Sequence, residues 1–86
     1  MEEFYILTDH ARERLALRSE IKEEWIEATV MNPDLISPHK NADYKQYVYK
    51  KIEEFDNRVL KVVASREGPP YIIYTLHFER SMKGKL

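Results

Sequence analysis

Residues 58–78, with the sequence RVLKVVASREGPPYIIYTLHF, decide the fold. Two runs rich in β-branched and aromatic residues, at 58–65 and 71–78, flank a Gly-Pro-Pro segment at 68–70, a combination typical of a turn. These runs predict two strands joined by a sharp reversal of the chain. The second run is apolar on both faces at 71–74, so we place it centrally in a sheet.

A further strand is predicted ahead of this pair. Residues 44–55 contain the segment Tyr-Val-Tyr at 47–49 and read as a strand with a charged end. The Asp-Asn pair at 56–57 is typical of a turn into the next strand. A polar stretch at 37–43 connects this region to the N-terminal half of the chain.

The N-terminal third has helical periodicity. A first helix is predicted over 9–18, with Thr8 or Asp9 at its N-cap, because either side chain can accept a hydrogen bond from the first turn. A second helix is predicted over 20–31, with Ser19 as its cap and apolar residues at helical spacing. The proline that follows biases the preceding residue away from helical angles and ends this helix.

Length and element order predict one α+β domain. The chain has 86 residues, and a single domain typically needs on the order of 100, so a second core does not fit. We expect two N-terminal helices packed on one face of a three- to four-stranded antiparallel sheet, with the other face open to a partner. The predicted order within residues 1–86 is a short first strand (1–8), two helices (9–31), an antiparallel sheet (44–78) and a basic tail (79–86).

The composition excludes several classes of protein. Hydrophobic residues make up 43% of the chain and charged residues 34%, a mixture typical of soluble globular domains. The absence of cysteine excludes disulfides, thiolate zinc sites and cysteine nucleophiles. No apolar run reaches the roughly 18 residues of a membrane helix. The acidic start at 1–4 does not resemble a signal peptide, so we expect a cytoplasmic protein without a membrane partner.

The net charge of −1 conceals an uneven distribution. Residues 1–43 hold five Lys and Arg against ten Asp and Glu, a balance of −5, whereas residues 44–86 hold nine against five, a balance of +4. Acidic residues therefore concentrate on the predicted helices and basic residues on the predicted strands. This asymmetry is compatible with an anionic partner on one side of the fold, and equally with charges that only solvate exposed faces.

His10 and Arg14 are four residues apart on the first predicted helix, so they lie on one face of it. A guanidinium disfavours the charged form of a neighbouring imidazole and keeps that imidazole available as a base. This pair suits metal-free RNA cleavage, in which a base removes the 2′-hydroxyl proton and a cation stabilises the transition state. The alternative is that His10 caps the helix or bonds a backbone carbonyl.

Two further candidates lie on the last predicted strand. Thr75 and His77 are two residues apart, so they are expected to share one sheet face with Ile73. Arg80 follows just beyond the strand. His77 complements His10 as the acid to its base if both reach the same end of the sheet, and the alternative is a structural role for His77.

Arg58 opens the middle predicted strand, on the side of Leu60 and Val62. A charge at this position lies at the rim of the sheet, where it either meets a phosphate or pairs with Glu53 or Glu54. The catalytic candidates are therefore His10, Arg14, Arg58, Thr75, His77 and Arg80.

Tyrosines interleaved with lysines form another pattern. Six of the 86 residues are tyrosine, and several alternate with lysine between positions 44 and 51. Aromatic rings on a sheet stack nucleobases while neighbouring cations hold the phosphates. The alternative is that tyrosine is simply favoured in half-buried strands. The nucleic-acid-binding candidates are Arg18, Lys45, Tyr47, Tyr49, Lys51 and Lys61.

No pattern indicates a metal ion or a cofactor. His10, His39 and His77 are scattered, and no His, Asp or Glu spacing repeats a known ligand pattern. Gly68 and Gly84 are the only glycines, and neither opens a predicted helix, so there is no glycine-rich phosphate loop. We therefore expect no metal site and no cofactor.

The motif His-Ala-Arg-Glu-Arg at 10–14, followed by an acidic helix and Asn-Pro-Asp at 32–34, resembles a family of small uncharacterised proteins grouped with the RelE-like and BrnT-like toxin folds. The strands at 55–63 and 74–80 resemble paired strands of that family, and the resemblance covers roughly residues 7–82. The resemblance implies a helix-covered antiparallel sheet of the RelE/barnase-like kind. Several proteins with that fold are ribonucleases that pair with antitoxins. The candidates carried over by the resemblance are His10, Arg14, Arg58, Thr75 and Arg80.

These observations support two predictions of function. The first is a toxin-like, metal-independent ribonuclease or RNA-binding protein whose partners are RNA and a small antitoxin. The second is a non-enzymatic interaction module, which either binds an acidic protein segment through its basic sheet face or forms a homodimer with the tyrosine-rich strand as its edge. RNA binding that weakens steeply with salt favours the first prediction over the second.

Overall fold

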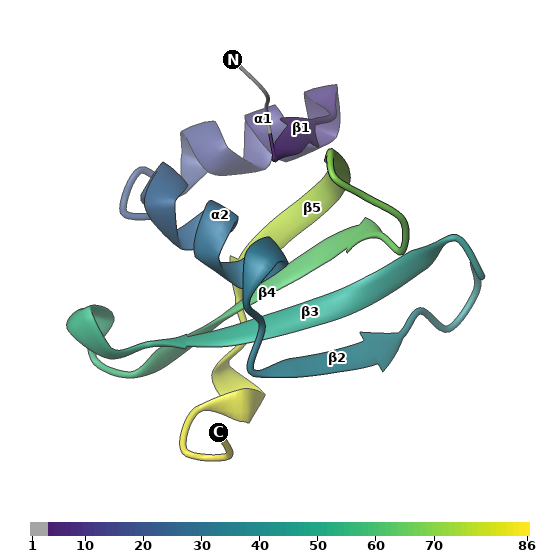
Figure 1. Cartoon of the computed structure of the whole chain (residues 1–86). Helices are drawn as coiled ribbons and strands as arrows, with labels where there is room; N and C mark the ends of the chain where they lie inside the picture. The colour runs from purple at the N-terminus through teal and green to yellow at the C-terminus, as the bar shows by residue number, and fades with distance from the viewer. Residues whose placement is uncertain (1–3) are drawn as a thin grey trace.

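The computed structural model describes residues 4–86 as two α-helices packed on a five-stranded sheet (Figure 1). The predicted α+β class is therefore confirmed. The elements are β1 (Tyr5–Leu7), α1 (Asp9–Leu17), α2 (Glu23–Met31), β2 (Leu35–Pro38), β3 (Lys45–Ile52), the 3₁₀ turn η1 (Glu53–Phe55), β4 (Arg58–Ser65), β5 (Tyr71–Phe78) and the 3₁₀ turn η2 (Arg80–Met82).

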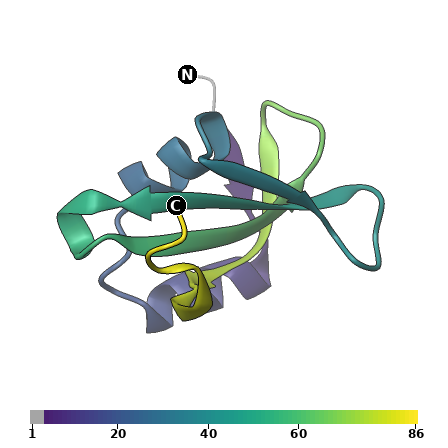
Figure 2. The same cartoon turned by 90° about the horizontal axis from the view of Figure 1, so that it is seen from below.

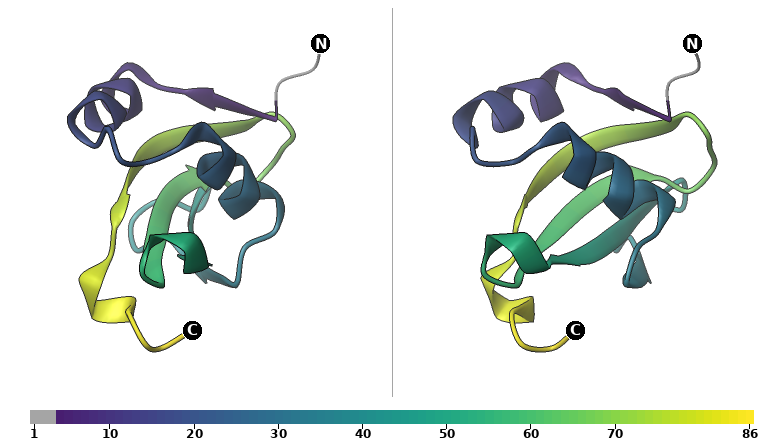
Figure 3. Two further views of the ribbon diagram at one scale, coloured as in Figure 1. Left: turned by 90° about the vertical axis from the view of Figure 1, so that its left-hand side faces the viewer. Right: turned by 60° about the vertical axis from the view of Figure 1, so that its left-hand side comes forward.

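The sheet is mixed and has the strand order β1-β5-β4-β3-β2. β1 pairs with β5 in parallel, with Tyr5 opposite Tyr71, and the other neighbouring strands are antiparallel. The prediction of a three- to four-stranded antiparallel sheet is therefore wrong, because β1 runs parallel to β5 and because β2 adds an edge strand. β5 is an interior strand, while β4 occupies the middle of the sheet. The tyrosine-rich strand β3 is also interior, so the expectation that it forms a sheet edge is wrong, because β2 pairs along it. Figure 3 shows the sheet twisting around α2, with β1 and α1 on the β5 side.

The strand boundaries differ from the predicted ones at two places. The strand predicted over 44–55 covers only Lys45–Ile52, and the 3₁₀ turn η1 follows it. Part of the polar stretch at 37–43 belongs to β2, since Ser37 pairs with Tyr47. The short strand predicted within 1–8 is β1, and residues 1–3 of that range lie outside the described part of the chain.

The helices begin with different kinds of cap. Thr8 caps α1 as predicted, because its side-chain oxygen accepts a 3.2 Å hydrogen bond from the Ala11 N–H group. Ser19 does not cap α2, which starts at Glu23 with Lys22 at its N-cap and without a side-chain cap. In the described residues 4–86, no helix has the length and apolar character that crossing a membrane requires.

One hydrophobic core joins both helices to the same face of the sheet. Val48, Val62 and Leu76 lie side by side across β3, β4 and β5, and each is at most 1% exposed. Ala11 of α1 and Ile26 of α2 belong to the same cluster and are fully buried. The prediction that both helices pack on one face is therefore confirmed, and within residues 4–86 no α-helix covers the opposite face.

A β-bulge in β5 changes which residues reach each face. Thr75 lies opposite Val63 of β4, but the next pairing joins Ile73 to Ala64, so Tyr74 is an extra residue on β5. Ile73 is therefore buried in the core, whereas Thr75 and the residue two positions later face the other side. The prediction that Thr75 and His77 share a face with Ile73 is wrong, because a bulge breaks the two-residue period of a strand.

The predicted basic tail at 79–86 is folded against the domain. It begins with η2, and the Lys83 ammonium lies 2.8 Å from the Asp56 carboxylate. The Lys51 ammonium donates a 3.5 Å hydrogen bond to the backbone oxygen of Leu86. Figure 2 views the sheet from the side away from the helices, and there the C-terminal segment lies in front of the strands.

Candidate functional site

Alternate residues of β3, β4 and β5 form the open face of the sheet, which is the face that the helices do not cover. The strand register places Tyr49, Lys61 and His77 in one row across these strands. Five predicted nucleic-acid-binding residues project from this face, as the two-residue period of the strands indicates. They are Lys45, Tyr47, Tyr49, Lys51 and Lys61.

Lys61 lies at the centre of the open face. Its ammonium nitrogen is 4.3 Å from the ring centroid of Tyr47 and 5.8 Å from that of Tyr49. The same nitrogen is 3.9 Å from a carboxylate oxygen of Glu79. Lys61 therefore covers the two tyrosine rings that sequence analysis assigned to base stacking, and cation–π attraction favours this arrangement.

Glu79 joins Lys61 to a histidine and a serine, and we call these four residues the Glu79 cluster. One carboxylate oxygen of Glu79 lies 3.4 Å from Nε2 of His77, and the other accepts a 3.0 Å hydrogen bond from the Ser81 hydroxyl. The hydrogen bonds from Ser81 and then His77 lower the pKa of Glu79 below its usual value. A carboxylate that stays ionised orients the imidazole ring of His77 by accepting its N–H group.

Three cations line a small pocket next to the Glu79 cluster. The pocket has a volume of about 290 Å³ and is lined by Arg58, Val59, Phe78, Glu79, Arg80 and Lys83; we call it the Arg80 pocket. The Arg58 guanidinium lies 4.9 Å from the Phe55 ring centroid. Within residues 4–86 the Arg80 side chain makes no hydrogen bond or ion pair, so its guanidinium is available to a ligand.

Lys83 is held at the rim of this pocket by Asp56. The hydrogen bond and the charge of Lys83 lower the pKa of Asp56 below its usual value, and the charge of Arg58 acts in the same direction. Asp56 and Asn57 both have positive φ angles, which fits the predicted turn between β3 and β4. This turn therefore sets the position of both Arg58 and Lys83.

The candidates on α1 lie in a different layer. His10 and Arg14 are neighbours as predicted, with a 3.5 Å contact between the Arg14 Nε and the His10 Nε2, and both are exposed. They belong to the helical layer, as does Arg18 at the end of α1, whereas His77 projects from the open face. The structure therefore does not assemble the acid–base pair of His10 and His77.

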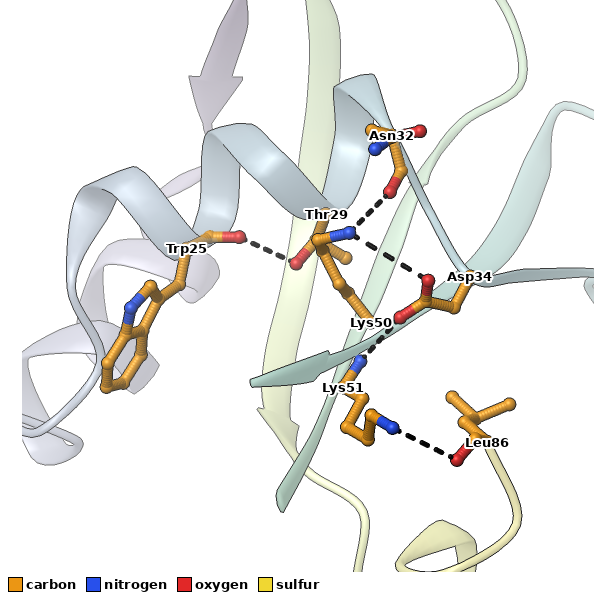
Figure 4. A network of polar contacts seen from close by, with 7 residues as sticks. All are labelled: Trp25, Thr29, Asn32, Asp34, Lys50, Lys51 and Leu86. Carbon is orange, nitrogen blue, oxygen red and sulfur yellow. Dashed lines mark hydrogen bonds and ion pairs between the residues drawn. The ribbon is translucent and has the colours of Figure 1, made fainter. Parts of the chain in front are cut away.

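A second polar network ties the end of α2 to β3 (Figure 4). The Lys50 ammonium donates a 2.9 Å hydrogen bond to the Asn32 carbonyl and lies 3.9 Å from the Asp34 carboxylate. The other carboxylate oxygen of Asp34 accepts a 2.9 Å hydrogen bond from the Lys51 N–H group. These contacts satisfy a carbonyl at the helix end and fix the entry into β2, so we assign the network a structural role.

Glu79, Ser81 and Lys83 were not among the site residues predicted from the sequence. Glu79 lies two residues after His77, and a period of two was the signal that could have placed both on one face. Ser81 and Lys83 carry no such signal, because their positions depend on how η2 turns the chain back. Within residues 4–86 no three His, Cys, Asp or Glu side chains gather in a way that could hold a metal ion.

The family model for a domain of unknown function, DUF4258, matches residues 7–78 of the chain, and the chain belongs to that family. No curated protein and no solved structure matches the chain. The match spans both helices and all strands except the start of β1. It therefore includes His77 and Lys61 and stops just before Glu79.

Proposed function

We propose that this DUF4258 protein binds single-stranded RNA on its open face and cleaves it without a metal ion. The observation that carries the proposal is the juxtaposition of the Glu79 cluster and the Arg80 pocket, since Glu79 belongs to both. An imidazole then lies beside cations that can bind a phosphate. Metal-free RNA cleavage needs this combination, because proton transfer and stabilisation of the charged transition state occur at adjacent atoms.

His77 is the general base in this proposal. When its Nε2–H group donates to Glu79, Nδ1 is left to accept the proton of the RNA 2′-hydroxyl. The 2′-oxygen attacks the adjacent phosphorus, the bond to the 5′-oxygen breaks, and that oxygen takes a proton from water. Lys61 and Arg80 stabilise the charge that develops on the phosphate. The products are a 2′,3′-cyclic phosphate and a 5′-hydroxyl end.

A relationship to the RelE-like and BrnT-like toxins is part of this proposal. It is supported by the His-Ala-x-x-Arg motif at 10–14 and by the position of candidate cations at the end of the sheet. Under this relationship a small antitoxin is the protein partner. Growth arrest on expression of the wild-type chain, but not of His77→Ala, is the expected result in cells.

The test compares two histidines in opposite layers. His77→Ala should lower the rate of RNA cleavage roughly 10²- to 10⁴-fold, the usual contribution of a general base. The matched control, His10→Ala, removes an exposed histidine from α1 and should leave the rate unchanged. Cleavage of end-labelled RNA is measured in excess EDTA, and the ends are identified chemically. If His10→Ala is inactive and His77→Ala is active, the site lies on the helical layer and this proposal is wrong.

An apolar edge favours the second candidate function, a protein-interaction module. Met31, Leu35 and Ile36 are 46%, 39% and 55% exposed, and they lie at or next to the edge strand β2. Exposed edge strands recruit a strand from a partner, so a protein or a second copy of the chain is the expected ligand. Light scattering of the wild-type protein and of Ile36→Lys measures self-association and tests this function. Association through the apolar edge should be present in the wild type and lost in the variant.

A further inference from the structure

Tyr44 differs from the other tyrosines of the open face in its exposure. Its side chain is 63% exposed, whereas Tyr49 is 9% exposed, and the Lys61 ammonium covers the Tyr47 ring. Tyr44 lies edge-on to Tyr74, with the ring centroids 6.3 Å apart and an interplanar angle of 69°. The Lys45 ammonium also approaches the Tyr44 ring, at 5.5 Å from its centroid. Because Tyr44 is nonetheless 63% exposed, it is the ring of this group that keeps a surface on which a flat ligand can stack.

The backbone beside Tyr44 is fixed by bonds to the end of β4. The Arg66 N–H group donates to the Tyr44 carbonyl at 3.0 Å, and the Arg66 guanidinium donates to the Asp43 carbonyl at 3.2 Å. Ser65 accepts a 2.9 Å hydrogen bond from the Ile72 N–H group. The loop that carries Tyr44 is thus tied to Arg66 at the end of β4, and β4 is in turn bonded to the start of β5, so a ligand does not have to order the loop.

These residues surround a surface pocket of about 610 Å³, which we call the Tyr44 pocket. Its volume is within the range typical of small-ligand sites. Arg66 lines it, and the Lys45 ammonium lies 4.4 Å from the Tyr74 ring centroid. The carboxylates of Asp43 and Glu67 also line it and balance these two cations. A pocket that is aromatic and close to neutral suits an uncharged base better than a bare phosphate.

The Tyr44 pocket lies at a defined distance from the proposed cleavage site. Ser65 lines the pocket, and Lys61 of the Glu79 cluster is four residues earlier on the same strand. At about 3.4 Å per residue of antiparallel strand, the two sites are about 14 Å apart. Both are on the open face, so a single extended strand of nucleic acid can reach both.

We propose that the Tyr44 pocket binds one unpaired nucleobase of a single-stranded RNA and thereby sets which phosphate reaches the Glu79 cluster. This inference rests on the proposed function, because it takes RNA as the ligand of the open face. Tyr44 supplies the stacking surface, Tyr74 packs against the edge of that ring, and Lys45 and Arg66 attract the adjoining phosphates. The pocket selects an unpaired base, because a base that stacks on a protein ring cannot at the same time stack within an RNA duplex.

The experiment is an abasic scan with RNA that cannot be cleaved. A fluorescent oligonucleotide with 2′-O-methyl groups lacks the attacking hydroxyl, and one base at a time is removed from it. Fluorescence anisotropy should show a roughly 5- to 140-fold loss of affinity at one position, the effect of one stacked base. In Tyr44→Ala this position-specific loss should disappear, whereas Tyr44→Phe keeps the ring and should behave as the wild type. Tyr44→Leu keeps an apolar side chain without a ring and should behave as Tyr44→Ala.

The outcomes separate this inference from the proposed function. RNA binding can be salt-sensitive while its affinity falls equally at every abasic position, or while Tyr44→Ala and Tyr44→Phe show the same position-specific loss. Either result overturns the Tyr44 pocket and leaves the proposed function in place. The absence of RNA binding at about 50 mM salt overturns both. RNA binding that is insensitive to salt and is lost in Ile36→Lys would be led by the apolar edge and not by phosphate contacts. That result assigns the chain to protein interaction and overturns both the Tyr44 pocket and the proposed function. Because Tyr44 is largely exposed, all three variants should keep the wild-type unfolding midpoint, and circular dichroism checks this.

Discussion

The two faces of β4 differ in chemistry although they belong to one strand. Leu60 and Val62 point toward the helices and are fully buried, whereas Lys61 between them reaches tyrosine rings and Glu79 on the open face. The helical face is closed and apolar, whereas the open face combines half-buried polar and aromatic side chains with the buried Val59 and Val63. The comparison teaches that alternate residues of the same strands carry stability and the candidate function. Changes on one face should therefore leave the property of the other face intact.

The largest effect is expected on the helical face, from Leu60→Ala. Leu60 is fully buried in the middle strand, so the substitution removes apolar contacts and leaves a cavity. The free energy of unfolding should fall by about 2–5 kcal/mol. Urea denaturation followed by circular dichroism measures it. A loss below about 1 kcal/mol would mean that the two faces do not divide stability as proposed.

The next largest effect is expected at the point where α1 is anchored to β5. Thr8 accepts a hydrogen bond from the Ala11 N–H group and donates one of 3.3 Å to the Tyr74 carbonyl at the bulge. Thr8→Ala removes both bonds and should destabilise the protein by about 0.5–2 kcal/mol. Thr8→Ser keeps the hydroxyl and is the matched control in the same denaturation experiment. Equal midpoints for the two variants would contradict the capping role.

Lys61→Ala should change stability less than either of these substitutions and should change RNA binding more. The ammonium belongs to an ion pair whose side chains are 20% and 28% exposed, and it contacts two rings; near a protein surface such interactions contribute on the order of 1 kcal/mol each. RNA affinity should fall, and the dependence of log affinity on log salt should become shallower by about one unit. Anisotropy titrations at several salt concentrations measure both. An unchanged salt slope would remove Lys61 from the RNA-binding surface.

The smallest effect on stability is expected from Glu79→Gln, and this effect should disappear as the pH is lowered. The pKa of Glu79 is lowered in the folded protein from an ordinary value of 4.5, so the unfolded chain binds more protons below that pH. Ionised Glu79 therefore stabilises the fold above about pH 4.5, and this contribution is lost as the pH falls further. The unfolding midpoint of Glu79→Gln should depend less on pH in this acidic range. Glu27→Gln, at an exposed position of α2, is the control and should follow the wild-type curve.

Sequence periodicity predicted the elements that are long and locally determined. Both helices were predicted from apolar spacing and caps, and the strands at 58–65 and 71–78 from runs of β-branched and aromatic residues; the bounds of these two strands agree with β4 and β5. β2 was missed because its four residues include a proline and gain a strand conformation only by pairing with β3. The parallel pairing of β1 was missed for the same reason, since it depends on a partner far along the chain.

The candidate site was predicted in part. The interleaving of tyrosine with lysine made Lys45, Tyr47 and Tyr49 candidates, and the strand register places the three on one face of the sheet. The bulge at Tyr74 was not visible in the sequence, so the face of His77 relative to the core was assigned incorrectly. Glu79 was taken as part of a basic tail, because only the turn of η2 brings it back to Lys61. Long-range contacts of this kind have no local signal.

The parallel pairing of β1 with β5 has a consequence for biosynthesis. Thr8, next to β1, bonds to Tyr74 of β5, which is 66 positions further along the chain. A ribosome adds roughly 5–20 residues per second, so the first strand waits about 3–13 s for its partner to be synthesised. Until then β1 has no strand with which to pair, and α1 cannot pack against β5. The last strand to leave the ribosome is therefore the one that completes the fold.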